Sequence, residues 1–170
     1  MKQHAMKIKY LIFVALLMQF LSINAQQDDK WENWRPLIGN WRGEGIAIPG
    51  EGTGSFSFTF DLNEKILIRR SNYDYLGEKM YTMFDDLMII YLVNGTPQKA
   101  IFFNHEGFSR TYSISYSNKT ITLITEKNPQ TPVFKLTYTL IDDTTLTLKY
   151  EIARDGENFI TYSEEIGKKK

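Results

Sequence analysis

The sequence predicts an all-β protein, folded as an antiparallel up-and-down β-barrel of about ten strands with a short N-terminal helix capping one end. Three observations lead to this fold class. From residue 41 onward, apolar and polar residues alternate with a period of two in one short segment after another, as in strands with one buried face. Turn residues interrupt these segments every eight to twelve positions, which is typical of sandwiches and barrels. Only one segment, near the N-terminus, has helical spacing of its apolar residues.

The first 25 residues have the three parts of a secretory signal peptide. Lys2, Lys7 and Lys9 form a basic start, an apolar run covers 10–21, and Ala25 is the small residue that a signal peptidase requires. We expect cleavage after Ala25, and therefore a periplasmic or secreted protein. The apolar run is shorter than the roughly 20 residues of a membrane span. An uncleaved anchor is the alternative.

The remainder, residues 26–170, suits one domain with one hydrophobic core. The whole chain has 20 basic and 20 acidic side chains. Loss of the three signal-peptide lysines leaves acidic side chains in slight excess, so there is no surplus of positive charge to attract nucleic acid. The sequence has no cysteine, which excludes disulfides, thiolate metal sites and a lipid-anchoring cysteine. We expect a monomer or homodimer that binds no nucleic acid and does not insert stably into a membrane after signal cleavage.

The helical pattern lies in DDKWENWRPLIG, residues 28–39. Two aspartates suit the N-cap, Trp31, Trp34 and an aliphatic residue follow at spacings of three to four, and Pro36 and Gly39 end the pattern. This predicts a short amphipathic helix that leads into the first strand. Its tryptophans can cover one open end of the barrel and complete the core.

The strands follow from the alternation and from the turns between them. They are predicted near residues 41–48, 54–61, 65–75, 85–93, 98–104, 108–117, 119–126, 132–142, 144–154 and 158–166. Connections this short join antiparallel neighbours. A meander of this size avoids edge strands with unpaired backbone groups by closing into a barrel. Residues 77–85 (GEKMYTMFD) are the least strand-like part, and we expect a longer loop or portal there.

Alternation alone does not say which face of a strand points inward. A soluble barrel turns its apolar face inward, whereas an outer-membrane barrel turns it toward lipid, and both kinds are exported. The chain ends in three lysines rather than an aromatic residue, and its connections are short at both ends of the barrel. These features favour the soluble barrel and leave a small outer-membrane barrel as the alternative.

The run GNWRGEG, residues 39–45, carries a resemblance to a known family. Its Gly-x-Trp motif resembles the first-strand signature of lipocalins and other calycins, and the extended Gly-x-Trp-x-Gly-x-Gly resembles the ten-stranded branch that is nitrobindin-like or fatty-acid-binding-protein-like. The segments DLMIIYL, AIFFNHEGFSRTYSIS and ILIRRSNYDY are also similar to small bacterial calycin-like domains of unknown function. The resemblance covers most of residues 26–170.

This resemblance implies a cavity lined by inward side chains. Trp41, Gly43 and Gly45 share one strand face, where the indole can close the barrel floor and the glycines can leave volume inside. Ten strands leave more room than the eight whose side chains fill a small barrel. Alternatively, the glycines serve only the curvature of the strand.

Nitrobindins hold haem through a histidine late in the barrel, and this sequence departs from that pattern. After signal cleavage its only histidine is His105, which falls in a predicted turn, NHEG. We therefore expect no haem bound in the nitrobindin manner. One histidine without cysteine is also a poor basis for a metal site, and the identity of any cofactor stays open.

Adjacent arginines in the third predicted strand must point to opposite faces. If Lys65 lies in solvent, Arg70 points into the barrel and Arg69 out of it. An interior arginine requires a partner, which is either the anionic group of a ligand or an interior acid such as Asp74 or Glu151. We therefore place Arg70 in the candidate ligand site.

Aromatic residues supply the rest of the candidate site. The sequence has ten tyrosines, and those expected on apolar strand faces can line a pocket with their rings and bind polar ligand groups with their hydroxyls. Alternatively, they form an ordinary core. With Phe58 of the SFSFTF strand, these tyrosines are Tyr91, Tyr112, Tyr138 and Tyr150.

No catalytic constellation is evident in the sequence. Ser109 lies near His105 only through the turn, there is no Gly-x-Ser-x-Gly motif, and Asp85 and Asp86 have no evident partner. The function expected is binding or carriage of a small hydrophobic ligand, which can be anionic, inside the barrel. An enzyme acting on such a ligand is the second hypothesis.

Overall fold

The structure, a computed structural model, describes residues 29–47, 51–76, 81–128 and 130–170. The predicted signal peptide, residues 1–25, lies outside these ranges. Ten strands are present in this part of the chain. They are β1 (Gly39–Ala47), β2 (Glu51–Asp61), β3 (Ile66–Leu76), β4 (Tyr81–Val93), β5 (Thr96–Asn104), β6 (Ser109–Ser117), β7 (Thr120–Thr125), β8 (Val133–Asp142), β9 (Thr145–Ala153) and β10 (Ile160–Lys169).

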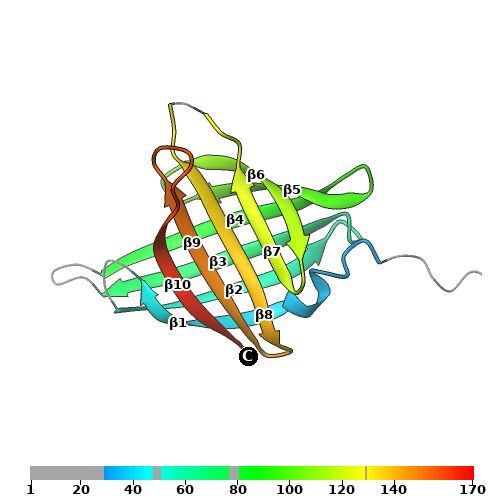
Figure 1. Cartoon of the computed structure of the whole chain (residues 1–170). Helices are drawn as coiled ribbons and strands as arrows, with labels where there is room; N and C mark the ends of the chain where they lie inside the picture. Colours follow the sequence, from blue (N-terminus) through cyan, green and yellow to red (C-terminus); the bar gives the residue numbers. More distant parts are fainter. Residues whose placement is uncertain (1–28, 48–50, 77–80, 129) are drawn as a thin grey trace, which may run out of the picture.

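The strands form one closed antiparallel barrel (Figure 1). Each strand pairs with the next in sequence, and β1 pairs with β10, with Gly43 opposite Gly167. The predicted all-β, up-and-down barrel of ten strands is therefore confirmed. Closure gives every strand two neighbours and removes the unpaired edges that an open sheet would expose.

Short turns produce this meander. Asn94 and Gly95 both have positive φ angles, 52° and 85°, and so do Asn118 and Lys119, 34° and 62°. Two central residues with positive φ match the turn geometry that suits the twist of a two-residue hairpin. These turns lie where the sequence predicted them.

One predicted boundary is wrong. Residues 77–85 were expected to form a loop, but β4 already begins at Tyr81, pairs with β3 from there and puts Tyr81 opposite Leu76. The apolar and polar residues of this segment do not alternate cleanly, so only the pairing with β3 identifies it as a strand. Residues 77–80 lie outside the described part.

The segment before β1 contains turns and a three-residue 3₁₀ helix, η1 (Arg35–Leu37), and the described residues from Asp29 onward form no α-helix. Its backbone bonds are mostly of the i to i+3 kind, such as Trp34 N to Trp31 O at 2.8 Å. Pro36 has no N–H and cannot continue an α-helical ladder. Within the described residues, no helix has the length and apolar character needed to cross a membrane.

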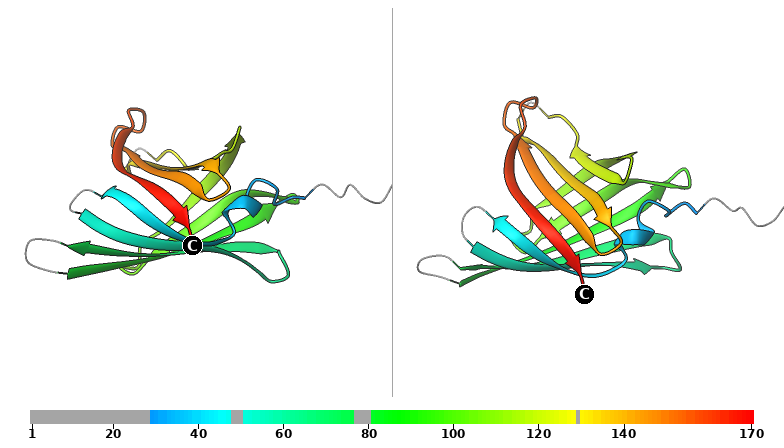
Figure 2. Two further views of the ribbon diagram at one scale, coloured as in Figure 1. Left: turned by 90° about the horizontal axis from the view of Figure 1, so that it is seen from below. Right: turned by 60° about the horizontal axis from the view of Figure 1, so that its bottom comes forward.

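The tryptophans of this segment nevertheless close one end of the barrel. Trp31 and Trp34 are fully buried and belong to the core, as the sequence predicted. The Trp31 ring packs on Phe60 with centroids 5.3 Å apart, and the Trp34 indole nitrogen donates to the Tyr116 hydroxyl at 2.8 Å. The C-terminal end of β10 lies at the same end of the barrel (Figure 2), where the Lys169 ammonium donates to the carbonyl oxygen of Pro36 at 3.0 Å.

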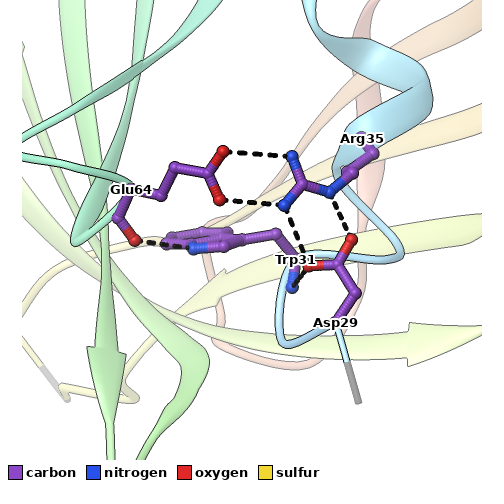
Figure 3. Close-up of polar contacts among 4 residues, drawn as sticks. All are labelled: Asp29, Trp31, Arg35 and Glu64. Atoms are coloured by element: carbon purple, nitrogen blue, oxygen red, sulfur yellow. Dashed lines mark hydrogen bonds and ion pairs between the residues drawn. The ribbon is translucent and has the colours of Figure 1, made fainter. Parts of the chain in front are cut away.

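An exposed clamp fastens this segment to the turn between β2 and β3 (Figure 3). Arg35 is bonded to the carboxylates of Asp29 and Glu64, with Nη2 2.8 Å from Glu64 Oε2. The carbonyl oxygen of Glu64 also accepts from the Trp31 indole at 2.9 Å. Glu64 is the last of three consecutive residues with positive φ, after Leu62 and Asn63. This left-handed turn directs both the carbonyl and the carboxylate of Glu64 toward the segment.

The apolar core lies inside the barrel. Leu67, Met88, Ile90, Leu123 and Leu146 are fully buried on inward strand faces. The alternation therefore has its apolar side inward, the reverse of the orientation expected for an outer-membrane barrel.

Candidate functional site

The interior of the barrel contains an arginine, but it is Arg69 and not the predicted Arg70. Arg69 is 3% exposed, whereas Arg70 lies on the outer face. The prediction assumed that Lys65 belongs to the strand, yet β3 begins at Ile66 and Lys65 closes the preceding turn. In the observed register Arg69 lies opposite the buried Phe58, and directly opposed residues point to the same face of a sheet.

Arg69 is held by neighbours from its own strand and from β4. Its Nη1 donates to Asp86 at 2.7 Å and its Nη2 to the Tyr73 hydroxyl at 3.0 Å. The guanidinium also lies over the Phe56 ring, 5.7 Å from the centroid. Burial disfavours the charged form of Arg69, but Asp86, Tyr138, Tyr73 and Glu165 together more than offset this and raise its pKa above the usual value. Arg69 and Asp86 therefore form a buried ion pair.

Three polar atoms beside this pair are buried without a hydrogen-bond partner among the described residues: Arg69 Nε, the Ser71 hydroxyl and the Tyr138 hydroxyl. Tyr138 comes from β8 and is 1% exposed. Burial raises the pKa of its hydroxyl, and the charge of Arg69 opposes that rise, so the two groups interact across the interior. Buried polar groups in proteins nearly always have a partner, so these three atoms are exceptions among the described residues.

A second carboxyl group, that of Glu165 in β10, lies near the same ion pair. We call Arg69, Ser71, Tyr73, Asp86, Tyr138 and Glu165 the Arg69 cluster. Glu165 is 9% exposed, and burial raises its pKa while the charge of Arg69 lowers it. A Cβ added at Gly43 would lie only 2.7 Å from Glu165 Oε2, so this glycine makes room for the carboxyl group. Gly54 likewise lies directly under the Tyr73 ring. Gly43, which was predicted to leave empty volume, instead leaves space for the Glu165 carboxyl group.

Tyrosines connect the cluster to the end of the barrel opposite the N-terminal segment. Tyr112 is 2% exposed, Tyr150 is half-buried, and Tyr162 is 47% exposed. Burial raises the pKa of Tyr112 to about 12, with Arg110 and Arg69 opposing the rise. The rings of Tyr150 and Tyr162 meet edge to face with centroids 5.9 Å apart. We call Tyr112, Tyr150 and Tyr162 the tyrosine row.

Arg110 lies beside this row. Its guanidinium lies over the Phe134 ring, 3.9 Å from the centroid, and the Phe134 ring stacks on Tyr150. Arg110 is half-buried, and a hydrogen bond from it to Tyr112 lowers the pKa of that hydroxyl. The end of the barrel opposite the N-terminal segment is therefore aromatic and carries a cation.

The other predicted site residues divide into two groups. Trp41, Phe58, Tyr112, Tyr138 and Tyr150 point inward, with Trp41 and Phe58 in the packed layer near the N-terminal segment. Trp41 donates its indole N–H to Leu37 O at 2.7 Å, which supports its predicted place at the barrel floor.

Tyr91 is not on the inward face. It pairs with Lys99 on the outer side of the sheet, since the inward positions of β4 are Met88 and Ile90. The prediction for Tyr91 is wrong because both faces of DLMIIYL carry apolar residues, so the pattern does not show which face is buried; in the structure Leu92 continues the inward face of Met88 and Ile90. Gly45 lies in β1, opposite Glu165 of β10 and Gly52 of β2, and its burial is outside the described part. His105 lies in the β5–β6 turn and is exposed, as predicted.

Sequence reasoning missed Arg69, Tyr73 and Glu165 as interior residues. Tyr73 lies four positions after Arg69 in the same strand and therefore on the same face. A sequence analysis that placed Arg69 inside the barrel would also have placed Tyr73 there. Glu165 lies in ITYSEEIGKK, where apolar and polar residues do not alternate, and only the pairing of β10 with β1 places it inside.

The outer face of β1–β4 has a polar hollow of about 600 Å³. Arg70 lines it together with Asn72 and Asp85, and the Asn72 amide donates to Asp85 at 2.6 Å. These side chains alternate with interior ones along the strands. Ser71 and Asp86 also line this hollow, so it borders the Arg69 cluster.

Comparisons with known proteins identify the fold. No protein-family model and no curated protein sequence matches this chain. Among solved structures, Rv2717c from M. tuberculosis has a TM-score of 0.59 at 12% identity, with 85% of this chain and 99% of that one covered. The S-type phycobiliprotein lyase CPES from Guillardia theta has a TM-score of 0.51 at 13% identity, with 85% and 98% covered. The chain therefore shares its barrel fold with these two proteins.

Proposed function

We propose that this barrel binds a small, largely apolar molecule in its interior, with the polar end of the ligand at the Arg69 cluster. The observation that carries the proposal is the set of three buried polar atoms without partners, Arg69 Nε and the hydroxyls of Ser71 and Tyr138. Leaving such atoms unpaired costs about 1–3 kcal/mol each. A ligand that satisfies them recovers that free energy on binding.

The surroundings suit an amphipathic ligand. Phe56 lies against Arg69, and the Tyr138 ring packs edge to face on Phe58 with centroids 5.5 Å apart. Apolar walls with a few converging polar groups are typical of small-molecule sites. The N-terminal segment occupies one end of the barrel, so the tyrosine row at the other end provides the entry route.

The fold neighbours support a ligand-binding role and add one alternative. One of them is a phycobiliprotein lyase, an enzyme. In the present chain the described site offers binding groups rather than a nucleophile with a base. Carriage is therefore the proposed role, and membership of the nitrobindin-like or fatty-acid-binding-protein-like branch stays a prediction. We also propose that the protein acts outside the cytoplasm, on the strength of the signal-peptide pattern in residues 1–25.

The test is a titration of the purified protein with N-phenyl-1-naphthylamine, a neutral apolar dye that fluoresces when bound. We expect saturable binding near one dye per chain, and native mass spectrometry is expected to show a small molecule that copurifies. Tyr112→Trp narrows the entry route and should weaken dye binding, whereas Tyr91→Trp on the outer face is the matched control. A folded barrel without saturable dye binding and without a copurifying molecule would show that water alone fills the three positions.

A further inference from the structure

The balance of charge in the Arg69 cluster indicates which kind of polar group a ligand would place there. This inference rests on the proposed function. The cluster contains one guanidinium and two carboxyl groups, Asp86 and Glu165. Asp86 already accepts from Arg69 Nη1 at 2.7 Å, and the side chains of this pair are only 4% and 11% exposed. The positive charge of Arg69 is thus neutralised before a ligand arrives.

An anionic head group would meet repulsion at this position. Charges of like sign interact strongly where water is excluded, and a ligand carboxylate beside Arg69 would lie near Asp86 and Glu165. Both carboxyl groups influence the pKa of Tyr138 in the same direction as burial, so their field reaches the unfilled positions. The cluster therefore disfavours a fatty-acid carboxylate, even though it contains an arginine.

The three polar atoms without hydrogen-bond partners determine which polar group of a ligand would suit this position. Arg69 Nε is a donor and requires an acceptor oxygen, while the Ser71 and Tyr138 hydroxyls can each donate or accept. The bonds to Asp86 and Tyr73 fix the other two nitrogens of the guanidinium, so Nε presents its N–H in a set direction. An uncharged group with both an acceptor oxygen and a donor N–H or O–H satisfies this set.

We propose that the polar end of the ligand is an uncharged hydrogen-bonding group, an alcohol or a primary amide, rather than an anion. Arg69 Nε donates to its oxygen, and the Ser71 and Tyr138 hydroxyls complete its hydrogen bonds. Asp86 sets this preference by keeping Arg69 neutralised, and Glu165 reinforces it.

Arg110 is another cation on the inward face, and it lies away from the Arg69 cluster. It stacks on Phe134 at the end of the barrel opposite the N-terminal segment, and none of the ion pairs among the described residues involves it. A ligand anion would be attracted there rather than to Arg69. Arg110 therefore provides the control that separates an anion at the entrance from an anion at the cluster.

The experiment is a displacement assay with bound N-phenyl-1-naphthylamine at pH 8, using 1-decanol, decanamide and decanoate. We expect the two uncharged compounds to displace the dye at concentrations at least about tenfold below that of decanoate, which corresponds to about 1.4 kcal/mol. Asp86→Asn leaves the charge of Arg69 unbalanced and should strengthen decanoate binding about tenfold relative to decanol. Arg110→Gln should leave the wild-type order unchanged.

The outcomes separate this inference from the proposed function. If the dye binds and decanoate is preferred by the wild type, the inference is overturned and the proposed function stands, and loss of that preference in Arg110→Gln would put the anion at the entrance. If the dye does not bind and no compound binds by native mass spectrometry, the proposed function itself fails. Should Asp86→Asn not fold, Glu165→Gln tests the same charge effect, and unchanged decanoate affinity in that variant would contradict the inference.

Discussion

Arg69 lies inside the barrel with two of its three nitrogens bonded, Nη1 to Asp86 and Nη2 to the Tyr73 hydroxyl. Its neighbour Arg70 lies outside, so two chemically identical residues one position apart have opposite environments. The difference arises from strand alternation, and it allows a matched pair of substitutions at adjacent positions.

Arg69→Met is expected to lower the free energy of unfolding by about 3 kcal/mol, because Asp86 is left buried without its cation. Arg70→Met makes the same chemical change on the exposed face and should alter it by less than about 0.5 kcal/mol. Urea denaturation at neutral pH measures both values. Similar losses in the two variants would show that Arg69 is not the interior arginine.

Two interior glycines make room for side chains of different stiffness. Gly54→Ala would press a methyl group against the rigid Tyr73 ring, and we expect a loss of about 1–3 kcal/mol. Gly43→Ala meets only the end of the flexible Glu165 side chain and should cost less. Thermal unfolding of the two variants gives the comparison, and an equal or larger effect at Gly43 would contradict the packing described here.

At the scale of the element, the segment before β1 works as a plug although it is not an α-helix. Pro36 and the i to i+3 backbone bonds keep it in successive turns, and these turns direct Trp31, Trp34 and Leu37 into the barrel. Helical spacing in the sequence correctly predicted which residues are buried. It did not predict the backbone, because turns of the 3₁₀ kind also repeat every three residues.

The clamp that holds the plug depends on pH. Arg35 lowers the pKa of Glu64 below 4.5 and that of Asp29 below 3.8 through hydrogen bonds. Since the folded pKa values are depressed, the stabilisation is fully present above the ordinary values and is lost as the pH falls through the lowered ones. The effect on overall stability is small because all three side chains are solvent-exposed.

We therefore expect acidification below about pH 4 to loosen the plug before the barrel unfolds. The protection factor of the Trp31 indole N–H, which is its intrinsic exchange rate at each pH divided by the rate that NMR measures, should fall first as the pH is lowered. Glu64→Gln should show faster exchange already at neutral pH, and Glu32→Gln, an exposed acid outside the clamp, is the control. A protection factor that is independent of pH and of Glu64 would mean that the tryptophan packing alone holds the segment.

At the scale of the whole molecule, the barrel separates three regions along its interior. Tryptophans and Phe58 fill the end covered by the N-terminal segment, the Arg69 cluster follows, and the tyrosine row leads to the opposite end. Closure through the β1–β10 pairing brings Glu165 to Gly43 and completes the polar cluster. An open sheet of the same strands would leave that carboxyl group outside.

Export is the prediction that concerns the whole chain. If residues 1–25 form a signal peptide, the mature protein begins at Gln26. Intact-mass measurement of the protein recovered from outside the cytoplasm of its host should give the mass of residues 26–170. Recovery of the full 170-residue chain in the membrane fraction would favour the uncleaved anchor.

The sequence by itself determined the strand count, the order of the hairpins and most strand boundaries, because period-two alternation and turn residues act over short distances along the chain. It also identified Tyr112, Tyr138 and Tyr150 as interior residues, since each lies in a regularly alternating strand. Only the tertiary structure decided which arginine points inward and that Glu165 and Asp86 lie near it. A turn that ends at Lys65 sets the parity of β3, and the closing pair β1–β10 sets the position of Glu165. The closing pair depends on contacts between residues far apart in sequence, which a local pattern does not contain. The turn is formed by neighbouring residues, but the alternation alone does not show whether Lys65 belongs to the turn or to the strand.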